Sequence, residues 1–176
     1  MIFARDPLAD PAPLIKRVYA YVAYRIGNGV DAEDITSETF ERALRYKATY
    51  DRSKGDPAAW LIGIARRLIA EHATARAAEG GVELPETVSA RGDVEGETIR
   101  QLSIRRAMAA LNDRQRELIA LRYGADLAAR EIARILDIKP NAVDVALHRA
   151  RARLEAELRA GGEGESTKIE VEPVRN

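Results

Sequence analysis

The sequence contains no cysteine and only two histidines, His72 and His148, which lie far apart in the chain. A chain without cysteine cannot form a disulfide, a thiolate metal site or a thiol nucleophile. No apolar run approaches the roughly 18 residues needed to span a membrane, and no signal peptide opens the chain. We therefore expect a cytoplasmic protein, and we expect no metal and no cofactor.

The chain also lacks net charge, because its 28 basic side chains balance 28 acidic ones. The balance is uneven along the sequence: residues 1–78 carry net +2, 79–98 carry −5, 99–160 carry +5 and 161–176 carry −2. Two mildly basic blocks are thus joined by an acidic strip and followed by an acidic tail. Since the basic excess is small, non-specific affinity for duplex DNA should be modest.

The first basic block has helical periodicity in three stretches and no convincing strand alternation. Asp31 is expected to cap the second helix, and Asp56-Pro57 is a strong start signal for the third. The expected helices cover residues 14–26, 31–46 and 57–77. The apolar side of the second helix is expected to hold Ile35, Phe40, Ala43 and Leu44.

The second basic block is dominated by the stretch 111–158. Asn112 is a good N-cap, and Gln115 three residues later can close a capping box. Gly124 is expected to end this helix, and a further helix is expected over residues 128–136.

A short turn over residues 137–139 then leads to Pro140, which suits the first position of another helix. Two helices joined in this way form a helix-turn-helix pattern, whose second helix would enter a DNA major groove. The apolar stripe of that helix is Val143, Leu147, Ala150 and Leu154.

A plain helical hairpin would show the same apolar stripes. Basic side chains beyond the stripe favour DNA binding, although a solvated helix face explains them too. These basic side chains are His148, Arg149, Arg151, Arg153 and Arg159.

We thus predict an all-α chain of two small helical domains joined by a flexible acidic linker. The expected parts are an N-terminal arm over residues 1–13, one domain over 14–78, the linker over 79–98, a helix-turn-helix domain over 99–160, and a disordered acidic tail over 161–176.

These patterns resemble the extracytoplasmic-function (group 4) sigma factors, the small sigma subunits of bacterial RNA polymerase in the sigma-70 family. The resemblance to region 2 lies in AEDITSETFERALRY and AAWLIGIARRLIAEH, and that to region 4 in LNDRQRELIALRY, EIARILDI and LHRARARL. It covers residues 14–158, and the order of the motifs is highly specific.

The resemblance implies a protein that directs core polymerase to promoters and starts transcription. Region 2 would read and melt the −10 element, and region 4 would read the −35 element. The implied partners are promoter DNA, the clamp helices of the largest polymerase subunit, the flap of the second-largest subunit, and an anti-sigma factor. The implied contacts are Asp34, Glu38, Phe40 and Arg42 for core polymerase; Arg52, Lys54, Trp60, Arg66 and Arg67 for −10 DNA; and Lys139, Asn141, His148 and Arg149 for −35 DNA.

The sequence departs from the family in the helix expected to read DNA. Asp144, Val145 and Ala146 stand where the family often has a Lys-Ser-Arg-like run, and Ala142 stands in place of a threonine. We hypothesise that region 4 binds its duplex weakly or with an unusual sequence, and that Val145 and Ala146 form an apolar patch for a protein partner.

Three alternatives remain open at this level. A sigma-like decoy would bind polymerase or an anti-sigma factor without initiating, and a helix-turn-helix regulator would bind DNA and usually dimerise. An enzyme is disfavoured: the acidic cluster at Asp31, Glu33, Asp34 and Glu38 could hold a hard cation, but helix capping explains it and no catalytic histidine accompanies it.

Overall fold

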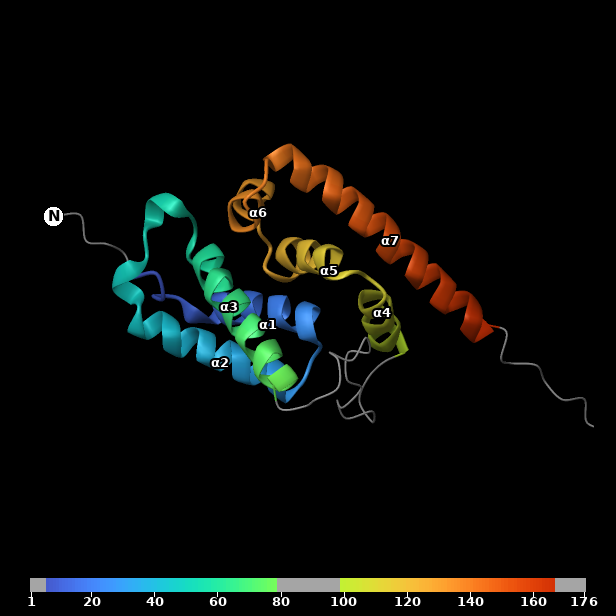
Figure 1. The fold of residues 1–176 in the computed structure, drawn as a ribbon, viewed down its shortest axis with the longest axis horizontal. Coiled ribbons are helices and arrows are strands. Elements are labelled where there is room, and N and C mark those ends of the chain that lie inside the picture. Colours follow the sequence, from blue (N-terminus) through green and yellow to red (C-terminus); the bar gives the residue numbers. More distant parts are fainter. Residues whose placement is uncertain (1–5, 79–98, 167–176) are drawn as a thin grey trace, which may run out of the picture.

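The computed structural model describes residues 6–78 and 99–166, and within these ranges the chain forms only helices and connecting turns (Figure 1). The first unit comprises α1 (Pro11–Ile26), α2 (Val30–Arg45) and α3 (Pro57–Ala78). The second comprises α4 (Ile99–Ala109), α5 (Asp113–Ile119), a π-helical segment (Ala120–Gly124), α6 (Ala129–Leu136) and α7 (Pro140–Ser166). The all-α prediction is confirmed for this part of the chain, whereas the expected linker at 79–98 lies outside it.

Two helix starts differ from expectation. The first helix begins at Pro11 rather than at residue 14, and so includes part of the expected N-terminal arm. Proline is well suited to the first helical turn. The expected cap at Asp31 is wrong: Gly29, with φ +131°, occupies the N-cap of α2 and makes no side-chain cap bond. Asp31 instead lies in the first turn, and its carboxylate is 3.0 Å from Arg76 of α3.

The apolar side of α2 is rotated relative to the expected one. Leu44 is 64% exposed, whereas Thr36 and Thr39 are buried. Each threonine hydroxyl donates to the carbonyl oxygen four residues earlier at 2.7 Å, which satisfies its polar group inside the helix bundle. Because the buried stripe runs through Ala32, Ile35, Thr36, Thr39 and Ala43, Leu44 falls just beyond its edge.

The capping box at the start of α5 is confirmed. The Asn112 side chain accepts from the Gln115 backbone N–H at 2.9 Å, and the Gln115 side chain accepts from the Asn112 N–H at 3.2 Å. The turn between α6 and α7 is made by Asp137 in the left-handed conformation at φ 53°, so aspartate replaces the glycine usual at such a turn.

Helix α7 begins at Pro140, as predicted, and buries Val143, Leu147 and Ala150. Its backbone continues to Ser166, into the segment expected to be a disordered tail. A glycine such as Gly161 costs a helix only about 1 kcal/mol relative to alanine, so it weakens the helix without stopping it. The rest of the expected tail lies outside the described residues.

The two units pack directly against each other. Helix α1 lies against the π-helical segment and α5, and α3 lies against α6 (Figure 1). One apolar core runs through both units, since Tyr21 and Leu61 belong to the same buried cluster as Leu118, Leu121 and Leu127. This shared core determines which surfaces of the chain remain accessible.

Candidate nucleic-acid interface

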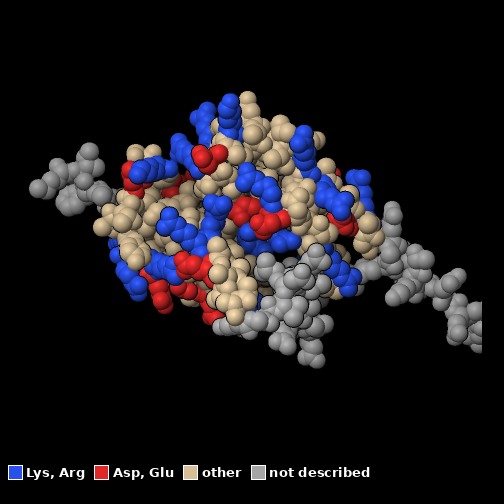
Figure 2. Space-filling view, viewed as in Figure 1, with Lys and Arg blue, Asp and Glu red and all other residues tan. Residues whose placement is uncertain are grey.

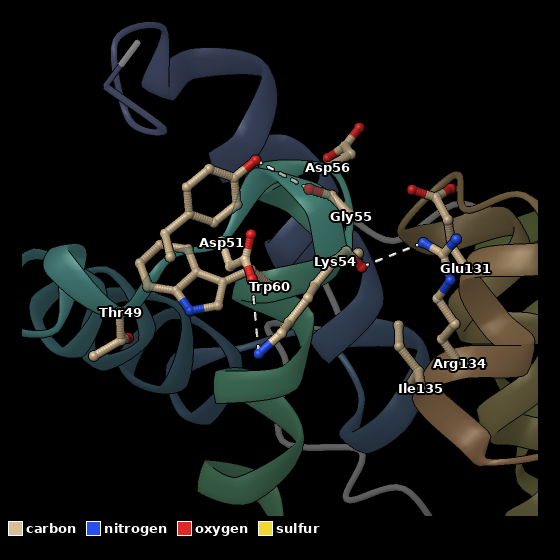
Figure 3. A pocket seen from close by; sticks show the side chains of 11 residues that line it. Thr49, Asp51, Lys54, Gly55, Asp56, Trp60, Glu131, Arg134 and Ile135 are labelled. Atoms are coloured by element: carbon tan, nitrogen blue, oxygen red, sulfur yellow. Dashed lines mark hydrogen bonds and ion pairs between the residues drawn. The ribbon is translucent and has the colours of Figure 1, made fainter. Parts of the chain in front are cut away.

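A pocket of about 200 Å³ opens between the loop before α3 and the side of α6 (Figure 3). One wall is aromatic: the rings of Tyr50 and Trp60 lie 5.4 Å apart, tilted by 56°. The Tyr50 hydroxyl donates to the Gly55 carbonyl oxygen at 3.0 Å and fixes the loop against the start of α3. The other wall comes from Glu131, Arg134 and Ile135 of α6.

The loop is organised by Asp51. Its carboxylate accepts from the Ser53 hydroxyl at 2.7 Å and from the Ser53 N–H at 2.9 Å, and these bonds lower the pKa of Asp51 below its ordinary value. Lys54 lies 3.7 Å from the same carboxylate, and its side chain is 83% exposed. The pocket therefore combines stacking surface with an accessible cation, the two features that bind a single-stranded base and its backbone.

The structure divides the five residues expected at −10 DNA. Lys54 and Trp60 both line the pocket. Arg52 and Arg67 are exposed, but neither lines it. Arg66 points elsewhere: its Nε lies 2.9 Å from Glu117 Oε1, and its Nη1 donates to the Ile135 carbonyl oxygen at 3.0 Å.

Glu117 is the centre of a polar cluster between the two units, which the sequence analysis did not identify. The buried Glu117 carboxylate accepts from the Tyr21 hydroxyl at 3.0 Å and lies 2.8 Å from Arg25 Nε, in addition to its contact with Arg66. Burial, together with the charge of Glu117, raises the pKa of Tyr21 far above its ordinary value. Glu117 ends a polar stretch that includes Arg114, Gln115 and Arg116, so no local signal in the sequence marks this carboxylate as buried, and the sequence could not supply its partners. We call Tyr21, Arg25, Arg66 and Glu117 the Glu117 cluster.

The residues expected at −35 DNA lie in the turn before α7 and along the N-terminal half of that helix. Lys139, Asn141, His148 and Arg149 are all exposed, on the side away from the buried Val143 stripe. The departures from the family pattern are exposed as well: Asp144 faces solvent and Val145 is 53% exposed. Figure 2 shows basic side chains along the edge that α7 forms in Figure 1. The remaining α7 arginines, Arg151, Arg153 and Arg159, are also exposed.

The residues expected at core polymerase lie on α2. Asp34 and Glu38 are exposed, whereas Phe40 is partly buried against the core. Arg42 lies 2.8 Å from Glu38 and 2.7 Å from Glu71, and the bond to Glu71 is the main cause that raises the pKa of Arg42. Leu44 is an exposed apolar side chain on this helix that was not among the expected contacts.

Neither a metal site nor a membrane span is indicated in residues 6–78 and 99–166. Among these residues, no group of three or more His, Cys, Asp or Glu side chains is placed to hold a metal ion. No helix within them is both long and apolar enough to cross a bilayer. Asp31 and Glu33 lie in the first turn of α2, where negative charge is favourable, and Asp31 also pairs with Arg76.

Comparison with known protein families matches both units. Residues 13–79 match the model of sigma-70 region 2, and residues 101–154 match that of sigma-70 region 4. The chain is 31% identical over 170 residues to the ECF RNA polymerase sigma factor SigD of Mycobacterium tuberculosis, covering 90% of this chain and 78% of SigD. It is 35% identical over 140 residues to the ECF sigma factor BldN of Streptomyces coelicolor, covering 76% of this chain but only 53% of BldN.

A solved structure shares the fold. It is the sigma factor RpoE of Bartonella quintana in complex with the anti-sigma factor NepR, with a TM-score of 0.69 and 21% sequence identity. The match covers 84% of this chain and 93% of RpoE.

Proposed function

Because this chain belongs to the extracytoplasmic-function (ECF) sigma factors of the sigma-70 family, we propose that it directs core RNA polymerase to promoters and starts transcription there. Region 2 would be the domain over residues 14–78, and region 4 the domain over residues 99–160. The observation that carries the proposal is the pairing of two features: the Tyr50–Trp60 wall with the exposed Lys54 in the first unit, and an exposed basic helix in the second.

In region 2 the pocket at Trp60 would receive a base flipped out of the −10 element. A flipped base needs a pocket that offers stacking and edge contacts, and the Tyr50–Trp60 wall supplies the stacking surface. Lys54, Arg52 and Arg67 would follow the backbone of the displaced strand, where cations gain affinity that falls with salt. Arg66 would join them once it is released from Glu117.

In region 4 the start of α7 would enter the major groove at the −35 element. Lys139 and Arg149 would contact phosphates or guanine, and Asn141 would contact adenine. Asp144 is exposed, as these residues are, and its carboxylate would repel a phosphate at close range. We therefore propose that duplex binding by region 4 is weak compared with that of a domain carrying a cation at this position.

The protein partners would bind other surfaces. The exposed side of α2, which carries Asp34, Glu38 and Arg42, would dock on the clamp helices of the largest polymerase subunit. Region 4 would dock on the flap of the second-largest subunit. An anti-sigma factor would hold the protein inactive; RpoE, which shares the fold, was crystallised in complex with the anti-sigma factor NepR. The protein would act in the cytoplasm with polymerase, and it would have no enzymatic activity of its own.

The decisive experiment is run-off transcription with core polymerase, the full chain and a library of genomic fragments. Starts that share two spaced motifs support the proposal and identify both promoter elements. Binding to core polymerase without any starts would favour a decoy, and duplex binding without core binding would favour a DNA-binding regulator.

A variant pair tests the role of region 2 in the same assay. Lys54→Ala with Arg67→Ala removes two of the proposed −10 cations and should reduce starts at least about tenfold, since each cation contributes salt-dependent affinity. Lys16→Ala with Arg114→Ala removes the same charge from exposed positions outside the pocket and outside α7, and should leave starts unchanged. Equal losses in both pairs would show that only net charge matters.

A further inference from the structure

The segment between α2 and α3 carries the aromatic wall of the pocket but has little core of its own. Its two short 3-10 helices, Lys47–Thr49 and Arg52–Lys54, bury no side chain. The Thr49 hydroxyl donates to the Tyr46 carbonyl oxygen at 2.7 Å, a bond that lies within the segment. Because 3-10 turns are weak and few buried contacts mean low local stability, this segment depends on neighbouring elements for its shape.

One such neighbour is the start of the described chain, residues 6–10, which we call the docked arm and which lies beside this segment (Figure 1). The Asp6 carboxylate accepts through Oδ2 from the ammonium group of Lys47. Its other oxygen, Oδ1, accepts from the Leu8 N–H at 2.9 Å, and the Asp6 carbonyl oxygen accepts from the Ala9 N–H at 3.1 Å. A local turn therefore holds the carboxylate and directs one of its oxygens at Lys47.

The docked arm is fixed to the body of region 2. The Leu8 side chain packs against the apolar core that includes Tyr21 and Leu61, and α1 begins at Pro11. The bonds from Lys47 and from the Leu8 N–H lower the pKa of Asp6 below its ordinary value, so its carboxylate is charged at neutral pH. The arm thus presents an anion from a defined position.

Lys47 is joined to the pocket by a short stretch of chain. Thr49 and Tyr50, two and three residues further on, both line the pocket. The Tyr50 ring packs against Trp60, and its hydroxyl donates to the Gly55 carbonyl oxygen. A displacement of Lys47 is therefore passed to the stacking wall.

The far end of the same segment has a separate anchor. Asp56 lies 3.3 Å from Arg17 of α1, and its Oδ1 accepts from the Ala58 N–H at the start of α3. The pair of Asp6 and Lys47 thus holds the beginning of the segment, and the pair of Arg17 and Asp56 holds its end.

We propose that Asp6 is a positioning residue for base capture: through Lys47 it holds the Tyr50–Trp60 wall in the shape that receives a base of the −10 strand. This inference rests on the proposed function and assigns part of it to the docked arm. Asp6 acts through Lys47 and makes no contact with the strand. Its loss lowers affinity for the strand because the wall is less well organised before binding.

The sign of the effect separates this role from a simpler one. If Lys47 were only a cation for the DNA backbone, Asp6 would compete with phosphate, and its removal would raise affinity. Positioning predicts the opposite. Asp6→Asn keeps an oxygen for the Leu8 N–H but removes the charge that faces Lys47. Asp10→Asn is the matched control, because it removes the same charge from an exposed residue of the arm that makes no side-chain cap bond.

The first measurement needs neither DNA nor polymerase. Trp60 is the only tryptophan, so quenching of its emission by acrylamide reports how well the wall is packed. Asp6→Asn should increase the quenching, whereas Asp10→Asn should leave it at the wild-type value. Helical circular dichroism must stay unchanged, which separates a local loosening from unfolding. Equal quenching in all three proteins overturns the proposal.

The second measurement is the affinity of the full chain for a labelled single strand carrying the −10 motif recovered from the genomic library. The two side chains are 43% and 41% exposed, so water screens the pair, and Asp6→Asn should lower affinity about threefold. The dependence of affinity on salt should stay the same, because no phosphate contact is lost. Asp10→Asn should bind as the wild type does.

A double-mutant cycle tests whether Asp6 acts through Lys47. Lys47→Gln should lower affinity by a similar factor, and adding Asp6→Asn to it should cause no further loss, because both changes break one contact. Losses that multiply would show that the two residues act independently, which refutes the proposed route.

The outcomes also separate this inference from the proposed function. If the wild-type chain starts no transcription with core polymerase, the proposed function fails and the inference fails with it. If the wild type starts transcription and Asp6→Asn binds the strand as well as the wild type or better, the sigma-factor role stands and the positioning role is refuted.

Discussion

Gly124→Ala should open the contact between the two regions by adding a single methyl group. Gly124 is the last residue of the π-helical segment and is buried against α1. The added Cβ would lie 2.9 Å from both the N and Cα atoms of Tyr21, and 2.9 Å from Cδ2 of Tyr24. Carbon atoms pack best at about 3.5–4.0 Å, so the Tyr21 backbone and the π-helical segment must separate by roughly 0.6–1 Å.

The expected magnitude follows from two opposing effects. Overpacking of a closely packed contact costs about 1–3 kcal/mol when rigid backbone must move. Replacing glycine by alanine within a helix favours that helix by about 0.5–1 kcal/mol, but it does so whether the regions are in contact or apart. Only molecules whose two regions touch bear the clash, and a cost of about 1.4 kcal/mol lowers the ratio of touching to separated regions about tenfold.

The assay is the rate at which a bismaleimide links thiols introduced by Asn28→Cys and Arg114→Cys, two exposed positions that flank the contact between Arg25 and Asp113. It is measured beside urea unfolding of the same proteins. Gly63→Ala is the control, because an added Cβ there meets nothing within 4 Å. We expect Gly124→Ala to slow linking about tenfold while Gly63→Ala leaves it unchanged. Identical linking rates in wild type and both variants would refute the argument that a close backbone approach holds the regions together.

Three further predictions concern separate parts of the chain. Asn112→Ala removes the capping box of α5 and should lower the free energy of unfolding by about 1 kcal/mol, as urea titration would show, whereas Ser37→Ala on the exposed side of α2 should change it little. Partial burial raises the pKa of Asp113, but the hydrogen bond from Arg25 outweighs it and holds that pKa below the ordinary 3.8. Because the pKa of Asp113 is depressed where the two regions touch, its carboxylate stabilises that contact at any pH above the ordinary pKa, and this stabilisation is lost as the pH falls through the depressed pKa. Energy transfer between dyes on the two regions should therefore stay constant from about pH 8 to 5 and report their separation below about pH 4. Asp113→Asn should lack that part of the pH dependence. Asp144→Arg should raise the affinity of the full chain for the recovered −35 duplex about tenfold and steepen its salt dependence by about one phosphate contact; unchanged binding would remove Asp144 as the cause of weak readout.

The parts of the fold that were predictable from sequence are those specified by neighbouring residues. The pair Asn112 and Gln115, and Pro140, act on helix ends a few residues away, and α5 and α7 begin where these signals place them. Leu44 shows the limit of such reasoning: its spacing is compatible with the apolar side of α2, but packing on α1 and α3 buries Thr39 instead and leaves Leu44 exposed.

The contact between the regions could not be predicted because its members have adequate local explanations. In the sequence Gly124 ends a helix, and Arg66 is a cation on a helix that resembles a DNA reader. Glu117 follows three polar residues, so the amphipathic pattern of α5 accounts for it as one more residue of the polar face. Only the three-dimensional arrangement shows that Arg66 and Glu117 bind each other across 51 positions of sequence.

Trp60, which packs at a tilt against Tyr50, can serve as an intrinsic fluorescence probe of the pocket. Trp60 is the only tryptophan in the chain, so all indole emission comes from one wall of the pocket, opposite α6. Withdrawal of α6 increases the contact of that ring with water and shifts its emission to longer wavelength, whereas a base stacked on the ring quenches it. Stopped-flow emission of the unlabelled protein can therefore resolve domain opening from base capture as two successive phases during promoter melting.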